Sequence, residues 1–129
     1  MRAVEPAVDF KSNRVSFIQL LGKGSQLIIM DADGKNLIVA YKAPLQVRLS
    51  RPSFLNSKEI VFSERLLNGK EFLRIYNSDS KKVRTIFENF EPALAPQLTS
   101  RGLIFASEKS GASNLYLASG DLKSAQAIT

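Results

Sequence analysis

RVSFIQ at residues 14–19, EIVFSE at residues 59–64 and GLIFAS at residues 102–107 are three versions of one apolar segment with phenylalanine at its fourth position. Each follows a proline that has an apolar residue two positions later, and each is followed by a glycine-containing loop and a second apolar run. Equivalent positions lie 42 to 46 residues apart. This period is typical of repeat architectures and close to one four-stranded propeller blade. We therefore expect one domain, residues 1–129, made of three units at about residues 3–46, 47–91 and 92–129.

Each unit contains four short runs rich in Val, Ile, Leu, Phe and Tyr, and no segment keeps the apolar spacing of a long helix. The dipeptides Asp33-Gly34 and Asn68-Gly69 favour hairpin turns. The predicted fold class is therefore all-β, with three four-stranded antiparallel propeller blades. The twelve expected strands are residues 4–8, 14–20, 26–31, 37–42, 47–54, 59–65, 71–77, 82–88, 93–98, 102–108, 114–119 and 125–129.

Several predicted strands are apolar at successive rather than alternate positions, as at residues 27–30, 60–62 and 103–106. Successive side chains of a strand point to opposite faces of the sheet, so both faces of these sheets need cover. Propeller blades meet this requirement because each blade packs between two neighbours.

These units resemble the TolB-like (WD40-like) family of β-propeller repeats, whose pattern reads approximately P-x-W-S-P-D-G-x-x-I-x-F-x-S-D-R-x-G and then I-Y-V-M-D-x-D-G. The third unit is the most similar, over residues 95–129. Matching positions in the other two units are Pro6, Val8, Val15, Phe17 and residues 28–34, then Pro52, Phe54, Ile60, Phe62, residues 63–65 and Gly69. The resemblance implies a six-bladed ring, a non-catalytic role in protein binding and a periplasmic or otherwise extracytoplasmic location.

Three blades are half of such a ring and would leave one apolar face bare on the first unit and one on the third. Terminal repeats of an open stack normally carry a polar outer face, yet residues 27–30 and 103–106 are apolar. Two chains related by a twofold axis would close the ring through first-to-third contacts made twice. We expect this homodimer, and the alternative is that the chain is a piece of a longer propeller.

The net charge of +6 is uneven, because residues 35–84 hold eleven Lys or Arg and four acidic residues. Such a surface favours an acidic protein, a polyanion or an anionic lipid as partner, or is simply solvated. Nucleic acid is not an expected partner, since no aromatic residues interleave with the cations as a stacking platform requires. The candidate basic partner surface consists of Arg48, Arg51, Lys81, Lys82 and Arg84.

The chain has no cysteine and no histidine, which removes thiolate nucleophiles, imidazole bases and the commonest zinc ligands. No apolar run is long enough for a membrane helix, and residues 1–10 lack the pattern of a secretory signal. We therefore expect no enzyme activity, no cofactor, no metal and no membrane insertion, and the compartment stays open.

Three short motifs have the residue types of ligand loops but favour structural roles. Residues 31–34 begin like a calcium loop, yet Lys35 and Lys42 occupy the fifth and twelfth positions, where oxygen ligands are needed. Residues 22–25 contain the glycines of a phosphate loop without a following helix. The Ser-acid-base triplets at residues 63–65 and 107–109 recur at one place in two units, which favours a structural turn.

The innermost strand of a propeller blade faces the central channel, where a small polar ligand or the tail of a partner could bind. The residues beside the three prolines are therefore the candidate channel lining, although plain solvent exposure in a wet channel is favoured over a binding role for each of them: Glu5, Ala7, Arg51, Ser53, Ala95 and Gln97. Two alternatives to a binding scaffold remain open. One is the propeller portion of a larger enzyme, such as a prolyl-oligopeptidase-like peptidase, and the other is a polyanion-binding module.

Overall fold

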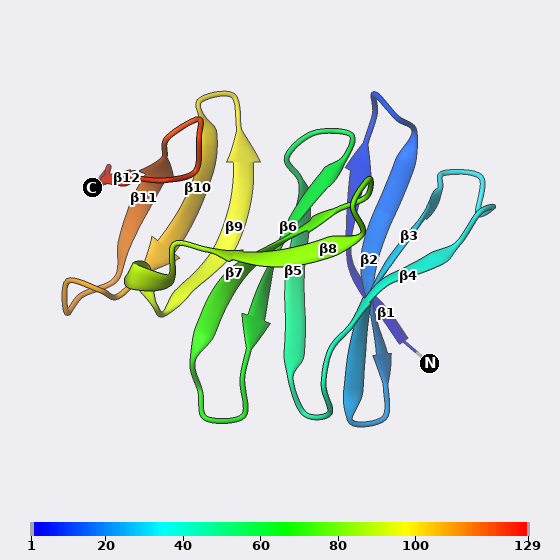
Figure 1. The fold of residues 1–129 in the computed structure, drawn as a ribbon, viewed down its shortest axis with the longest axis horizontal. Coiled ribbons are helices and arrows are strands. Elements are labelled where there is room, and N and C mark those ends of the chain that lie inside the picture. The colour runs from blue at the N-terminus through cyan, green and yellow to red at the C-terminus, as the bar shows by residue number, and fades with distance from the viewer. Residues whose placement is uncertain (1, 129) are drawn as a thin grey trace.

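The computed structural model describes residues 2–128 and places their strands in three four-stranded antiparallel sheets. The sheets stand side by side in chain order, with the two termini at opposite ends of the row (Figure 1). The strands are β1 (Arg2–Asp9), β2 (Arg14–Leu21), β3 (Gly24–Asp31) and β4 (Ile38–Lys42) in the first sheet, β5 (Arg48–Phe54), β6 (Glu59–Arg65), β7 (Glu71–Asn77) and β8 (Lys82–Ile86) in the second, and β9 (Ala93–Thr99), β10 (Gly102–Ser107), β11 (Asn114–Ala118) and β12 (Ala125–Ala127) in the third.

The twelve predicted strands are confirmed, with β6 and β7 at their predicted bounds and every other strand end at its predicted residue or within two residues of it. Residue 129, the predicted end of the last strand, lies outside the described residues. The strand expected at residues 82–88 ends earlier, at Ile86, because Phe87 adopts a left-handed conformation with φ of 54°. The 3₁₀ helix η1 (Glu88–Phe90) follows and turns the side chains of Phe87 and Phe90 into the core.

The innermost strands β1, β5 and β9 share one irregularity immediately before their proline. Glu5, Arg51 and Ala95 have φ of 53°, 52° and 54°, and the ladder to the neighbouring strand shifts register there. Proline cannot donate a hydrogen bond to the ladder, so a bulge is a place where a strand tolerates it. The three units therefore repeat a backbone bend as well as a sequence pattern.

A first core lies between the first and second sheets and a second core lies between the second and third. Ile60 and Phe62 of β6 face the first sheet, whereas Val61 between them faces the third. The successive apolar residues of β6 thus cover both faces of one sheet, as predicted. The strand residues that form these cores are Ile18, Leu27, Ile29, Ile60, Phe62 and Tyr76 in the first and Val61, Leu73, Ile75, Leu103, Phe105, Tyr116 and Ala118 in the second.

Buried serine hydroxyls tie the first and the second sheet to the segment that follows each of them. The Ser25 hydroxyl donates to the Val47 carbonyl oxygen at 2.9 Å and accepts from the Leu49 amide at 3.1 Å. The Ser63 hydroxyl accepts a bond from the Ala95 amide of the third sheet at 3.1 Å. Ser63 and its two neighbours lie within β6, so the turn predicted for residues 63–65 is wrong while a structural role for Ser63 is confirmed.

Candidate interaction surfaces

The outer face of the first sheet repeats the positions that the next two sheets bury. Phe62 and Phe105 face the preceding sheet and have no exposed surface. Phe17 is their equivalent in β2 and is only half-buried. Phe17 pairs with the buried Ile28 across β2 and β3, and Ile28 pairs with the exposed Val39 on the same outer face.

The outer face of the third sheet repeats the positions that the first two sheets use to hold the next sheet. Leu27 and Leu73 have no exposed surface, whereas their equivalent Leu115 is 43% exposed. Leu117, the equivalent of the buried Ile29, is likewise only half-buried. The two outer faces of the chain therefore occupy positions equivalent to the two sides of the contact that it makes twice internally.

The candidate channel lining falls into two groups. A hollow of about 550 Å³ is lined by Arg51, Ser53, Ala95 and Gln97, together with residues of the third sheet's outer face. Glu5 and Ala7 of β1 lie outside this hollow. The Glu5 carboxylate instead accepts a hydrogen bond from the Arg51 amide, which links the bulges of the first and second sheets.

The candidate basic residues do not form one patch. Arg48 begins β5 at one end of the second sheet, Arg51 lies at the bulge, and residues 81–84 belong to the β7–β8 hairpin at the opposite end. Arg84 lies 3.7 Å from Glu59. These cations belong to one repeat in the sequence, but in the structure they lie at two opposite ends and at the bulge of the second sheet.

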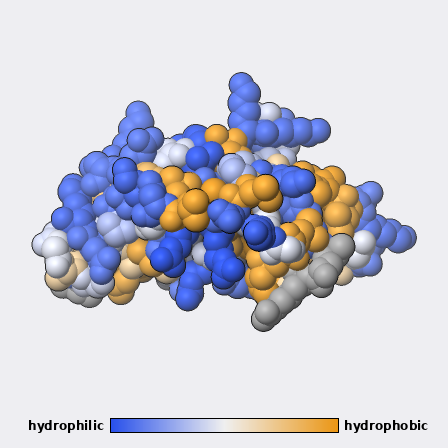
Figure 2. Space-filling view, turned by 90° about the horizontal axis from the view of Figure 1, so that it is seen from below, coloured by the Kyte–Doolittle hydropathy of each residue, from blue (hydrophilic) through white to orange (hydrophobic). Residues whose placement is uncertain are grey.

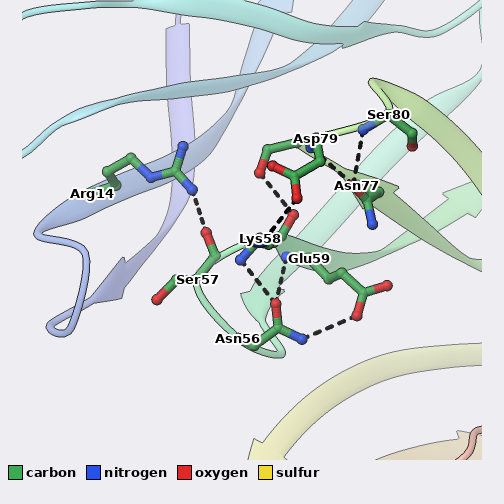
Figure 3. Close-up of polar contacts among 9 residues, drawn as sticks. Arg14, Asn56, Ser57, Lys58, Glu59, Asn77, Asp79 and Ser80 are labelled. Carbon is green, nitrogen blue, oxygen red and sulfur yellow. Dashed lines mark hydrogen bonds and ion pairs between the residues drawn. The ribbon is translucent and has the colours of Figure 1, made fainter.

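Hydrogen bonds and ion pairs organise the end of the second sheet that carries the β7–β8 hairpin (Figure 3). The Lys58 ammonium lies 2.9 Å from Asp79, whose carboxylate raises the pKa of Lys58. The Asn56 side chain accepts bonds from the Lys58 and Glu59 amides at 2.8 and 2.9 Å. Asn77 does the same for the following turn, so the asparagines here stabilise the two hairpins of this sheet.

A buried polar group that the sequence did not reveal joins the first two sheets. The Tyr41 hydroxyl donates a hydrogen bond of 2.8 Å to the buried carboxylate of Glu64, and Arg74 lies 3.8 Å from the same carboxylate. Burial and the Glu64 carboxylate raise the pKa of Tyr41 to about 12. The three residues come from three different strands, and only the packing of two sheets brings them together. The Tyr41–Glu64 hydrogen bond therefore links the first sheet to the second.

The turn interpretation of two loop-like motifs is confirmed. The Asp31–Gly34 segment closes with a bond from the Gly34 amide to the Asp31 carbonyl oxygen, and residues 22–23 form the β2–β3 turn. Residues 2–128 include no group of three or more Asp, Glu, His or Cys side chains placed to hold a metal ion. Within the same range, no helix has the length and apolar character needed to span a bilayer.

Comparison with solved structures decides the fold. TolB from Acinetobacter baumannii superposes on 99% of this chain with a TM-score of 0.80 at 16% sequence identity. The chain has a TolB-like propeller-type fold. It spans 32% of the length of that TolB chain. No family model and no curated protein matches the sequence. At this identity the likeness to TolB shows the fold alone.

Proposed function

We propose that this chain is a non-catalytic, TolB-like propeller scaffold for protein binding, and that two copies complete one six-bladed ring. The observation that carries the proposal is the pair of uncovered outer faces, which repeat the two sides of the internal contact. In the ring, Phe17 of one copy packs against Leu115 and Leu117 of the other. Phe62 packs in the same way against Leu27 and Ile29 inside the chain.

A twofold ring makes this contact twice, so the apolar area buried in both contacts contributes to the free energy of association. Burying one exposed aliphatic or aromatic side chain fully contributes about 1.5–3 kcal/mol. Association costs about 4–15 kcal/mol of lost translational and rotational freedom. Several apolar side chains on each face are therefore needed to offset this cost. The faces provide Val8, Phe17, Val39, Leu115 and Leu117.

A binding role also agrees with the chemistry of the chain. Histidine and cysteine are absent from the sequence. The buried acid Glu64 lies between two sheets in contact with Tyr41 and Arg74, away from any open surface. The hollow beside Arg51 and Gln97 offers polar groups on an open surface, which suits a partner's polypeptide segment.

The test uses one substitution on each outer face. Phe17→Asp and Leu117→Asp should each be monomeric alone, because a charge then lies in both contacts of the ring. Mixed together they should recover a dimer, since one of the two contacts in the mixed pair has both wild-type faces. Leu67→Asp is the control and should dimerise like wild type. If the mixture of the two variants formed no dimer, the head-to-tail ring would be contradicted.

A second candidate is that the missing blades belong to the same, longer polypeptide, either a complete propeller or the propeller portion of an enzyme. The chain spans only 32% of the length of the TolB chain, and this observation favours the second candidate. It predicts a monomer with both outer faces exposed, and a reading frame that continues into further blades or into an α/β-hydrolase domain.

The exposed cations of the β7–β8 hairpin are proposed to attract an acidic partner. Reversing them to Glu should change stability by no more than about 0.5 kcal/mol, because exposed substitutions and surface ion pairs contribute little. Retention on a heparin column at about 0.1 M salt should fall, since an attractive field at the surface is lost. Unchanged retention would leave this hairpin as a solvated surface. The substitutions are Lys81→Glu, Lys82→Glu and Arg84→Glu.

A further inference from the structure

Three connections at one end of the molecule each expose a leucine. Leu21 precedes the β2–β3 turn, Leu45 lies between β4 and β5, and Leu67 lies between β6 and β7, with exposed fractions of 39%, 77% and 76%. The connections are neighbours, because the Gln46 amide donates a 3.0 Å hydrogen bond to the Lys23 carbonyl oxygen and Gln46 lines one hollow with Leu67. Figure 2 views this end and shows apolar residues across its middle with hydrophilic residues around them.

Cations line two hollows beside these connections. Arg48 and Arg65 are direct partners across β5 and β6 and line a hollow of about 260 Å³. Lys23 and Arg48 line a second hollow of about 120 Å³ beside the β2–β3 turn. None of these three cations makes an ion pair among the described residues. Like charges directly opposite in a sheet are destabilising, so an anion bound between Arg48 and Arg65 would relieve their repulsion.

The equivalent connection of the third sheet, residues 108–113, reads EKSGAS and has no leucine. The exposed leucines are therefore not a general feature of the repeat. They lie at three separate connections between strands, and cations line the hollows beside these connections. A protein partner would need three separate apolar pockets to receive such tips, whereas a lipid bilayer needs none.

We propose that this end of the molecule binds the surface of an anionic lipid membrane. Leu21, Leu45 and Leu67 enter the boundary between headgroups and acyl chains, and the cations contact headgroup phosphates. Apolar residues combined with Lys and Arg are the combination that binds proteins reversibly at such interfaces. The surface lies wholly within one chain, so this inference does not depend on the ring. If the ring forms, its twofold axis runs along the channel, and both copies present this end on the same side.

Vesicle sedimentation tests the proposal with two probes, phosphatidylcholine alone and phosphatidylcholine mixed with phosphatidylglycerol, at about 0.1 M salt. Wild type should sediment with the mixed vesicles and not with phosphatidylcholine alone. A Lys or Arg near an anionic membrane contributes about fivefold in affinity, so Arg48→Gln with Arg65→Gln should weaken binding about 25-fold. Leu45→Ser with Leu67→Ser should also abolish most binding, while circular dichroism stays unchanged.

Matched controls lie at the opposite end of the molecule. Lys11→Gln with Lys35→Gln removes two exposed charges, and Leu37→Ser removes one exposed leucine, so both variants should bind like wild type. An equal loss in the two double charge variants would mean that net charge alone drives binding and would overturn the proposal. The absence of vesicle binding would also overturn the proposal. Binding to polyglutamate that the leucine substitutions leave unchanged would overturn it too, because it would indicate an acidic polypeptide as the partner.

Discussion

Replacing Phe105 by alanine tests whether the blades are held together by the contacts described. Phe105 has no exposed surface, and its ring centroid lies 4.8 Å from that of Phe87, 5.6 Å from that of Phe90 and 5.8 Å from that of Tyr116. Deleting a buried phenylalanine ring costs about 3–5 kcal/mol, because transfer free energy and packing are both lost. Phe105→Ala should therefore lower the free energy of unfolding by about this amount. Phe62→Ala should do the same.

Urea denaturation followed by circular dichroism measures this change, provided that the slope of the transition stays constant. A small domain has only about 5–15 kcal/mol of stability, so Phe105→Leu serves as a milder variant if the alanine variant does not fold. The control is Phe10→Ala, whose ring is almost fully exposed and whose loss should cost within about 0.5 kcal/mol. A loss below about 1 kcal/mol for Phe105→Ala would refute the packing argument. If the ring forms, the stability that Phe17→Ala loses relative to wild type should increase with chain concentration, because Phe17 is then buried between two copies.

Two further predictions concern buried polar groups. The pKa of Tyr41 is about 12 in the folded chain against an ordinary value of 10.0, so its contribution to stability is complete below pH 10 and is lost as the pH rises through 12. Tyr41→Phe should therefore lose less thermal stability than wild type between pH of about 10 and about 12, and equal losses would contradict the raised pKa of Tyr41. Ser107→Ala leaves the Phe90 carbonyl oxygen without its 2.6 Å hydrogen bond and should cost about 1–3 kcal/mol by urea denaturation, whereas Ser110→Ala should be neutral.

The parts of the fold that depend on local pattern could be predicted from the sequence. β6 and β7 have their predicted bounds because Glu59–Arg65 and Glu71–Asn77 each contain a short apolar stretch and are flanked by turn residues. The successive apolar residues of β6 also predicted a sheet covered on both faces, which the two cores confirm. Both signals are carried by neighbouring residues in the chain.

Features that depend on distant residues could not be predicted. The left-handed conformation of Phe87 accompanies the stacking of its ring on Phe105, which lies in another sheet. The contact of Tyr41 with Glu64 joins strands from two different sheets. The predicted basic surface grouped cations by their place in one repeat, whereas antiparallel strands send Arg48 and the β7–β8 hairpin to opposite ends of the sheet.

The molar mass in solution tests the central claim most directly. One chain has a mass of 14.3 kDa, and light scattering at micromolar concentrations should give twice that value for a closed ring of two copies. The mass should stay at two chains as concentration rises, because a twofold ring leaves no free outer face for further addition. A mass of one chain at every concentration, or a mass that keeps growing, would contradict the ring.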